Sequence, residues 1–172
     1  MKRSYLVLIA VVAACTQFAQ AADLIRYPLP NKSTFPIAQA VEVPGDGTVV
    51  YMSGVTPAPA DPKAAVNTVD YWGNTRAQTL SVFSRMDVAM KALGLGYGDI
   101  IKMTVFLVGD PALAGRMDFT GFMEGYSQFF GTATQPNLPA RSTVQVAGLV
   151  SPGMLVEIEV TLVRPPVASS KP

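Results

Sequence analysis

The fold is decided by a stretch near the C-terminus that reads Pro139-Ala-Arg-Ser-Thr-Val-Gln-Val146 and continues, after a turn with Pro152-Gly153, into Val156-Glu-Ile-Glu159. Apolar and polar residues alternate on both sides of this turn, so the stretch predicts two strands, at 140–146 and 154–163, joined as a hairpin. One face of each strand is mostly apolar and suits packing under helices. The opposite faces carry polar side chains: Arg141, Thr143, Gln145, Glu157, Glu159 and Thr161.

If the two strands pair, these polar side chains become neighbours on one face of the sheet. One interpretation is a solvated face on which Arg141 makes a surface ion pair, worth about 0–1 kcal/mol. The other interpretation is a subunit seam or a ligand cleft. Arginine suits such a cleft because its planar guanidinium grips a carboxylate through two parallel hydrogen bonds.

The segment before this stretch predicts two helices and a buried strand. Apolar residues recur at helical spacing over 75–93, and Gly94 and Gly96 end that pattern. Residues 100–108 form a mostly apolar run, which is typical of a buried strand. Residues 119–130 again place aromatic and apolar residues at helical spacing and predict a second helix.

The N-terminal half predicts a further hairpin. Residues 37–43 and 48–55 are rich in β-branched side chains, and Pro44-Gly-Asp-Gly47 between them is a turn signal. Residues 56–74 contain three prolines and indicate a long loop. The resulting order β-β-α-β-α-β-β predicts a two-layer α+β domain, in which two helices pack on one face of a mixed sheet.

The first 21 residues have the pattern of a secretory signal peptide. Lys2 and Arg3 precede an apolar stretch of ten residues, and Ala19 and Ala21 form an A-x-A cleavage site. Ten apolar residues are too few to span a bilayer comfortably. We therefore expect an exported, periplasmic protein.

A lipoprotein is the alternative, because Val12-Ala-Ala-Cys15 resembles the box in which the cysteine becomes lipidated. In that case the protein is anchored to a membrane through Cys15, and otherwise we expect no membrane contact. The mature chain then divides into an arm at 22–36, a domain at 37–164 and a tail at 165–172.

Composition limits the chemistry of the mature domain. The chain has 172 residues, of which 49% are hydrophobic, enough for the core of one domain. Histidine is absent and the single cysteine is Cys15, which removes histidine-based triads, thiol nucleophiles and most zinc or iron sites. The formal net charge is +1 and no run of basic residues is present, so nucleic-acid binding is not expected.

The C-terminal stretch resembles the signature of the RidA family, also called YjgF. In this signature an arginine, here Arg141, precedes a pair of glutamates, here within Val156-Glu-Ile-Glu159. Supporting matches are Met52-Ser-Gly54 with Pro57, Gln78, Gly98-Asp-Ile-Ile-Lys102 and Thr104-Val-Phe106. The resemblance covers residues 35–164, nearly the whole mature domain.

The resemblance implies a chorismate-mutase-like α+β fold and a homotrimer with clefts between neighbouring subunits. It also implies hydrolysis of reactive 2-imino acids and their enamine tautomers to 2-keto acids and ammonia, without a cofactor or a metal ion. By position in the signature, Arg141 would hold the substrate carboxylate and Glu157 would orient the attacking water, so these are the expected catalytic residues. Thr143, Ser53 and Gly54 would line the cleft and, with Arg141, bind the substrate.

Three positions depart from the pattern of the family. Ile37 replaces a tyrosine that usually reaches the cleft, Met123 stands where an asparagine is common, and Arg85 replaces a helix asparagine. We therefore expect a more apolar cleft wall. Two other functions stay open: a non-catalytic trimer that binds a small carboxylate, and a nuclease or RNA-binding protein, against which the net charge and the signal peptide argue.

Overall fold

The computed structural model describes residues 24–45 and 47–164. It therefore includes the whole predicted domain apart from Asp46. The predicted signal peptide, Cys15 and the tail at 165–172 lie outside the described residues, so export and lipidation stay predictions. Among the described residues, no helix is both long enough and apolar enough to cross a bilayer.

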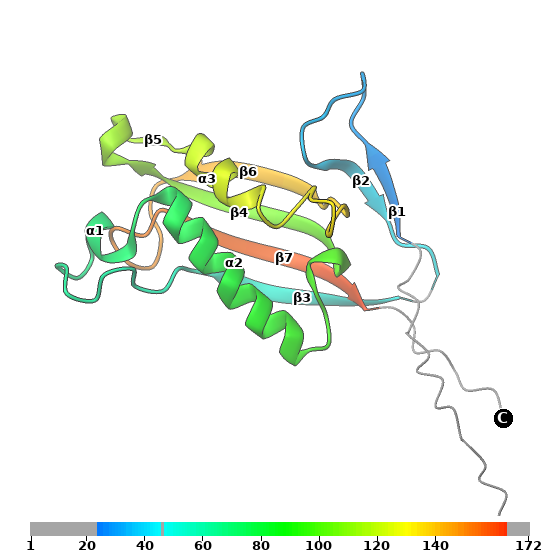
Figure 1. Ribbon diagram of the computed structural model, residues 1–172, viewed down its shortest axis with the longest axis horizontal. Helices are drawn as coiled ribbons and strands as arrows, with labels where there is room; N and C mark the ends of the chain where they lie inside the picture. The colour runs from blue at the N-terminus through cyan, green and yellow to red at the C-terminus, as the bar shows by residue number, and fades with distance from the viewer. Residues whose placement is uncertain (1–23, 46, 165–172) are drawn as a thin grey trace, which may run out of the picture.

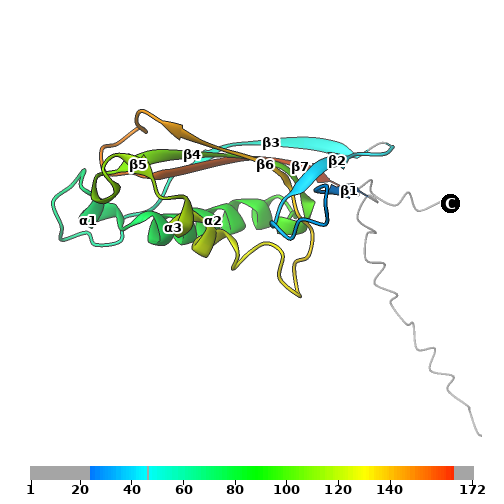
Figure 2. The same cartoon turned by 90° about the horizontal axis from the view of Figure 1, so that it is seen from above.

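One sheet and one layer of helices make up the domain (Figure 1). The strands are β1 (Ile25–Pro28), β2 (Ala38–Glu42), β3 (Thr48–Val55), β4 (Ile100–Asp110), β5 (Arg116–Met117), β6 (Ala140–Val146) and β7 (Val156–Arg164). The helices are α1 (Val69–Trp72), α2 (Thr75–Ala92) and α3 (Phe119–Tyr126), with 3-10 turns η1 (Tyr97–Asp99) and η2 (Pro111–Leu113). Seen from above, the helices cover one face of the sheet and leave the other uncovered (Figure 2), which confirms the two-layer α+β architecture.

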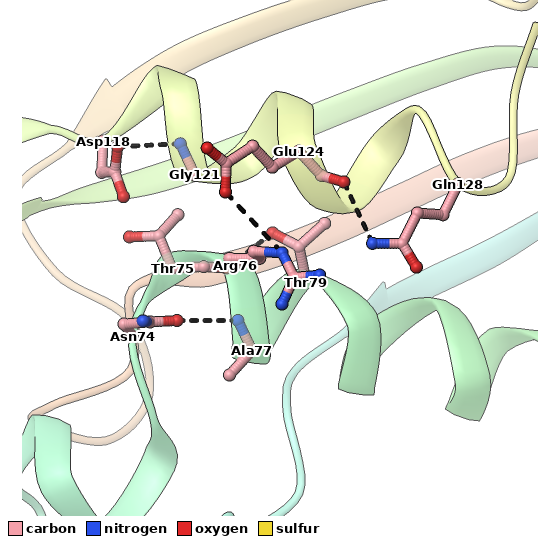
Figure 3. Close-up of polar contacts among 9 residues, drawn as sticks. All are labelled: Asn74, Thr75, Arg76, Ala77, Thr79, Asp118, Gly121, Glu124 and Gln128. Atoms are coloured by element: carbon pink, nitrogen blue, oxygen red, sulfur yellow. Dashed lines mark hydrogen bonds and ion pairs between the residues drawn. The ribbon is translucent and has the colours of Figure 1, made fainter.

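The helix α2 lies where its apolar stripe predicted it. Its N-terminus is capped by Asn74, whose side chain accepts a hydrogen bond from the Ala77 amide (Figure 3). Helix α3 is shorter than the predicted 119–130, because it ends at Tyr126. The Gln128 side chain donates to the Glu124 carbonyl, to which the backbone amide of residue 128 would donate in a continuing helix.

The predicted N-terminal hairpin is wrong. Strand β2 pairs with β1, and it meets β6 in parallel through Ala38 and Ala140. Strand β3 instead pairs with β7 along its whole length, from Thr48 opposite Arg164 to Val55 opposite Ile158. The turn signal at Pro44 therefore does not make β2 and β3 partners. Strand β7, which is mostly buried, offers β3 a longer ladder than the exposed β2 does.

The predicted C-terminal hairpin is also wrong, because β4 lies between β6 and β7. The sheet order is β1-β2-β6-β4-β7-β3, with β6 parallel and β7 antiparallel to β4. Strand β4 is the longest strand and alternate residues along it are buried, so it needs a partner on each side to satisfy its backbone hydrogen bonds. The segment between β6 and β7 therefore passes the end of β4 rather than forming a tight turn.

This strand order places the two polar sets on opposite faces, not on one face as predicted. Directly opposed residues of a ladder share a face. Met103 is buried under the helices and opposes Arg141, so Arg141 points toward the helical layer. Phe106 opposes Glu157 on the uncovered face. Thr143 and Gln145 lie on the same face as Arg141, and Glu159 lies on the same face as Glu157.

Helices α2 and α3 lie side by side (Figure 3), and Gly125 of α3 lies at a contact without space for a side chain. A Cβ atom on Gly125 would lie 2.7 Å from Thr79 Cγ2, closer than real side-chain carbons approach. Beside this contact, Arg76 Nε and Glu124 Oε2 lie 3.7 Å apart in an exposed ion pair. The close approach lets Phe122 and Tyr126 of α3 reach the core that α2 covers.

We predict that Gly125→Ala destabilises the fold by about 1–3 kcal/mol, because the added methyl group overpacks the contact between α2 and α3. The measurement is the midpoint of urea unfolding. Gly148→Ala is the matched control, since a Cβ there meets nothing within 4 Å and the backbone φ is not in the left-handed region. If the two variants lowered the urea midpoint equally, this result would contradict the packing argument.

Candidate functional site

The Arg141 guanidinium lies in a cage of aromatic rings between β6 and α3. Its Cζ atom is 4.3 Å from the ring centre of Tyr126 and 5.0 Å from that of Phe122. Phe35 and Phe119 follow at 5.4 and 5.9 Å. Such cation–π contacts contribute about 0.5–2 kcal/mol each and do so without neutralising the charge.

The guanidinium has no anionic partner within the described part of the chain. Its Nη2 atom lies 3.3 Å from the Met123 sulfur, and its Nη1 atom is buried without a hydrogen-bond partner. Burial lowers the pKa of Arg141, but arginine stays charged in proteins. A buried charge without a counter-ion is costly. Arg141 and the four rings around it therefore form a candidate binding site for an anion, which we call the anion socket.

A second orphaned polar atom lies next to the first. Among the described residues, Thr143 Oγ1 is buried without a partner, two positions from Arg141 on the same face of β6. Gln145, next in this row, is occupied: its Oε1 accepts from the Met117 amide at 2.8 Å and its Nε2 donates to the Gly115 carbonyl at 2.9 Å. The polar row thus offers a cation and a hydroxyl to a ligand.

The aromatic cage is positioned by segments far apart in the sequence. The Tyr126 hydroxyl donates to the Pro36 carbonyl at 2.9 Å and so fixes the chain just before β2. This fixation places Phe35 over the guanidinium, stacked on Phe119 at 6.3 Å. Burial raises the pKa of Tyr126 to about 12, so its hydroxyl keeps its proton near neutral pH.

Glu157, Ser53 and Gly54 form a second group on the uncovered face of the sheet. A bulge interrupts the pairing of β3 with β7 between Met52 and Val55, at Ser53 and Gly54. A Cβ atom on Gly54 would collide with Glu157 Oε1, so only glycine lets the carboxylate lie against the strand. Glu157 makes no salt bridge within the described residues.

The structure therefore brings Arg141 together with Thr143, and Glu157 together with Ser53 and Gly54, but it separates the two groups by the thickness of the sheet. The sequence did not reveal the cage around Arg141. Tyr126 was interpreted as core packing, and it does pack in the core, but one face of its ring also contacts the guanidinium. The helical spacing of Phe119, Phe122 and Tyr126 was the available signal.

The three departures from the family pattern lie in different places. Met123 contacts the guanidinium directly. Ile37 instead lines a hollow of about 170 Å³ on the side of Arg26 and Leu138. Arg85 donates to the Thr56 carbonyl and holds the start of the long loop. In the described ranges, no three or more histidine, cysteine, aspartate or glutamate residues are grouped as metal ligands would be.

Comparison with known proteins identifies the class of this chain. Residues 28–164 match the family described as Endoribonuclease L-PSP, so the chain belongs to that family. A relative in Salmonella typhimurium, the 2-iminobutanoate/2-iminopropanoate deaminase, is 33% identical over 129 residues, which cover 75% of this chain and 88% of the relative. The membership in the RidA (YjgF) family that the C-terminal stretch predicted is thereby confirmed.

Solved structures agree with this assignment. Escherichia coli TdcF with bound serine is 31% identical, with a TM-score of 0.52 over 77% of this chain and 91% of that chain. The Rid-family protein YyfB from Yersinia pestis has a TM-score of 0.60 at 20% identity, covering 80% of this chain and 97% of that chain, and it shows the fold alone. The chorismate-mutase-like fold expected from the sequence is confirmed.

We predict that Arg141→Met leaves the thermal midpoint of the ligand-free protein unchanged or raises it, because methionine fills the aromatic cage without a buried charge. Arg26→Met is the matched control. Arg26 is also half-buried, but it donates to the carbonyls of Gly98, Ile100 and Leu138, so its loss leaves these acceptors unsatisfied and lowers the midpoint. If Arg141→Met lowered the thermal midpoint more than Arg26→Met does, this result would contradict the interpretation of Arg141 as an anion-binding group.

Proposed function

We propose that this protein hydrolyses 2-imino acids and their enamine tautomers to 2-keto acids and ammonia. The observation that carries the proposal is the buried guanidinium of Arg141, which lacks an anionic partner and lies beside the free hydroxyl of Thr143. Every 2-imino acid bears a carboxylate that would neutralise this charge through two hydrogen bonds. The relative named 2-iminobutanoate/2-iminopropanoate deaminase supports the choice of reaction.

The active site would form between subunits. Arg141 and Glu157 point to opposite faces of one sheet, so one cleft could contain both only if two copies of the chain meet there. The uncovered face also exposes apolar side chains, including Tyr51 at 81% and Val144 at 44% exposure, which an assembly would remove from water. We therefore propose a homotrimer in which Arg141 and Thr143 of one subunit face Glu157, Ser53 and Gly54 of the next.

The reaction needs little beyond positioning and proton transfer. With the carboxylate on Arg141, the C2 carbon of the protonated imine is already electrophilic. Glu157 would accept a proton from water as its oxygen bonds to C2 and would return the proton to nitrogen. The carbinolamine then collapses: the C–N bond breaks, ammonia leaves, and the C2 hydroxyl gives its proton to the Glu157 carboxylate as it becomes the keto oxygen. An enamine must first gain a proton at C3.

A non-catalytic trimer that binds a small carboxylate is the second candidate. It is favoured by the surroundings of Arg141, which consist of aromatic rings and of the Met123 sulfur at 3.3 Å from Nη2. The two candidates share the anion socket and differ only in whether Glu157 of a neighbour reaches the substrate. Nucleic acid as a ligand has no comparable support, because the net charge is +1 and the socket is lined with rings.

We predict that the protein accelerates keto-acid release when an amino-acid oxidase generates a 2-imino acid in the assay. Arg141→Ala should lower kcat/KM by about 100-fold or more, because the substrate carboxylate loses a charged partner. Glu157→Gln should lower kcat by about 10²–10⁴-fold and leave keto-acid binding intact. Full activity of Arg141→Ala would sink the deaminase proposal, and keto-acid binding by the wild-type protein without turnover would favour the binding trimer.

Co-expression of the two inactive variants tests the shared cleft. If Arg141 and Glu157 come from different subunits, mixed trimers of Arg141→Ala and Glu157→Gln contain clefts with both intact residues, roughly a quarter of all clefts for random assembly. Activity should therefore reappear in the mixture. No recovery in mixed trimers that are demonstrated by differential tagging would contradict a cleft shared between subunits.

A further inference from the structure

A hollow adjoins the anion socket and has no part in the chemistry proposed above. Its volume is about 450 Å³, within the range of about 300–1,000 Å³ that is usual for ligand pockets. Leu113, Met117 and Phe119 provide its apolar part, and Gln145 lies on the side of the sheet. Arg116, Asp118 and Thr120 provide its polar part. A hollow of this size can hold a group much larger than a methyl or ethyl side chain.

The hollow and the socket share one side chain. The Phe119 ring lines the hollow, and its centre is 5.9 Å from the Arg141 Cζ atom. On the sheet side, Arg141 and Gln145 stand in one row on β6, with Thr143 between them. A molecule whose carboxylate is bound by Arg141 thus lies within one ring width of the hollow.

The inner side of the socket is filled, because Tyr126 and Phe122 are fully buried in the core. Phe35, on the outer side, is 39% exposed and stacks on Phe119 with an angle of 19° between the rings. The stacked Phe35 and Phe119 rings thus provide an apolar path from the socket toward the hollow.

The hollow is held open by contacts that do not involve a ligand. Gln145 bonds to the backbone at Met117 and Gly115. The Asp110 side chain accepts from the Ala112 amide at 2.8 Å, and the Gly115 amide donates to the Asp110 carbonyl at 3.0 Å. A preformed apolar pocket binds an apolar group without an ordering cost.

We propose that the preferred substrates are 2-imino acids with a large apolar side chain, an aromatic ring above all, and that Phe119 and Leu113 determine this specificity. The inference rests on the deaminase proposal for the identity of the reacting group. The carboxylate lies on Arg141, the ring of the substrate continues the stack of Phe35 and Phe119, and its far edge contacts Leu113 and Met117. A substrate whose side chain is only a methyl group would leave the hollow filled with water.

The test compares binding of two product-like acids, pyruvate and 3-phenylpyruvate, to the full-length assembled protein by titration calorimetry. We expect 3-phenylpyruvate to bind at least about tenfold more tightly, the least that an apolar pocket gives for added apolar groups. Leu113→Asn should reduce this ratio several-fold, since it places a polar group in the hollow at a position that is 38% exposed and not part of the core. Phe119→Ala should reduce the ratio as well.

Val88→Asn is the matched control, because Val88 is an exposed apolar residue on α2 and does not line the hollow. This variant should keep the wild-type ratio. Equal affinities for the two acids, binding of neither acid, or a ratio that survives both Leu113→Asn and Phe119→Ala overturns the specificity inference. The deaminase proposal fails separately, through absence of turnover in a protein that retains the expected binding ratio.

Discussion

The candidate site depends on a partly buried cation that has no anion beside it within the described residues. Arg141 projects from β6 into the helical layer, where rings surround it and no carboxylate approaches. Without other contacts, such a side chain would adopt a conformation exposed to solvent, because desolvation of a charge costs several kcal/mol. Two restraints oppose this conformational change. The parallel ladder with β4 fixes the backbone of Arg141 opposite Met103, and the quadrupole of each ring stabilises the charge where it lies.

The sheet order explains why the candidate site is split in two. A hairpin between β6 and β7 would set Arg141 and Glu157 on one face as neighbours. With β4 inserted between these strands, and with the parallel pairing of β6, the same alternation directs the guanidinium to the helices and the carboxylate to the uncovered face. The bulge at Ser53 and Gly54 then gives the carboxylate room on that face.

The sequence predicted local features well and long-range pairings poorly. The stripe of α2, the buried strand β4 and the alternation of β6 and β7 are properties of short segments, and each was identified correctly. The partner of a strand is not a local property. The turn signals at Pro44 and Pro152 suggested hairpins, but the ladders join β3 to β7 and β6 to β4. The cage was missed for the same reason, since Phe35 reaches Arg141 through contacts between distant segments, namely the bond of the Tyr126 hydroxyl to the Pro36 carbonyl and the pairing of Ala38 with Ala140.

Separating the guanidinium from the carboxylate within one protomer has a chemical consequence. If both lay on one face of one sheet, they would form an ion pair, and a substrate carboxylate would have to displace Glu157 from Arg141 before it could bind. Rings cannot compete in this way, because they stabilise a cation without supplying an acceptor for its N–H groups. The cage therefore keeps Arg141 charged, desolvated and open to an anion, while Glu157 keeps its lone pairs for water. In the proposed trimer, the carboxylate comes from a neighbouring subunit, so the two groups would meet only with the substrate between them.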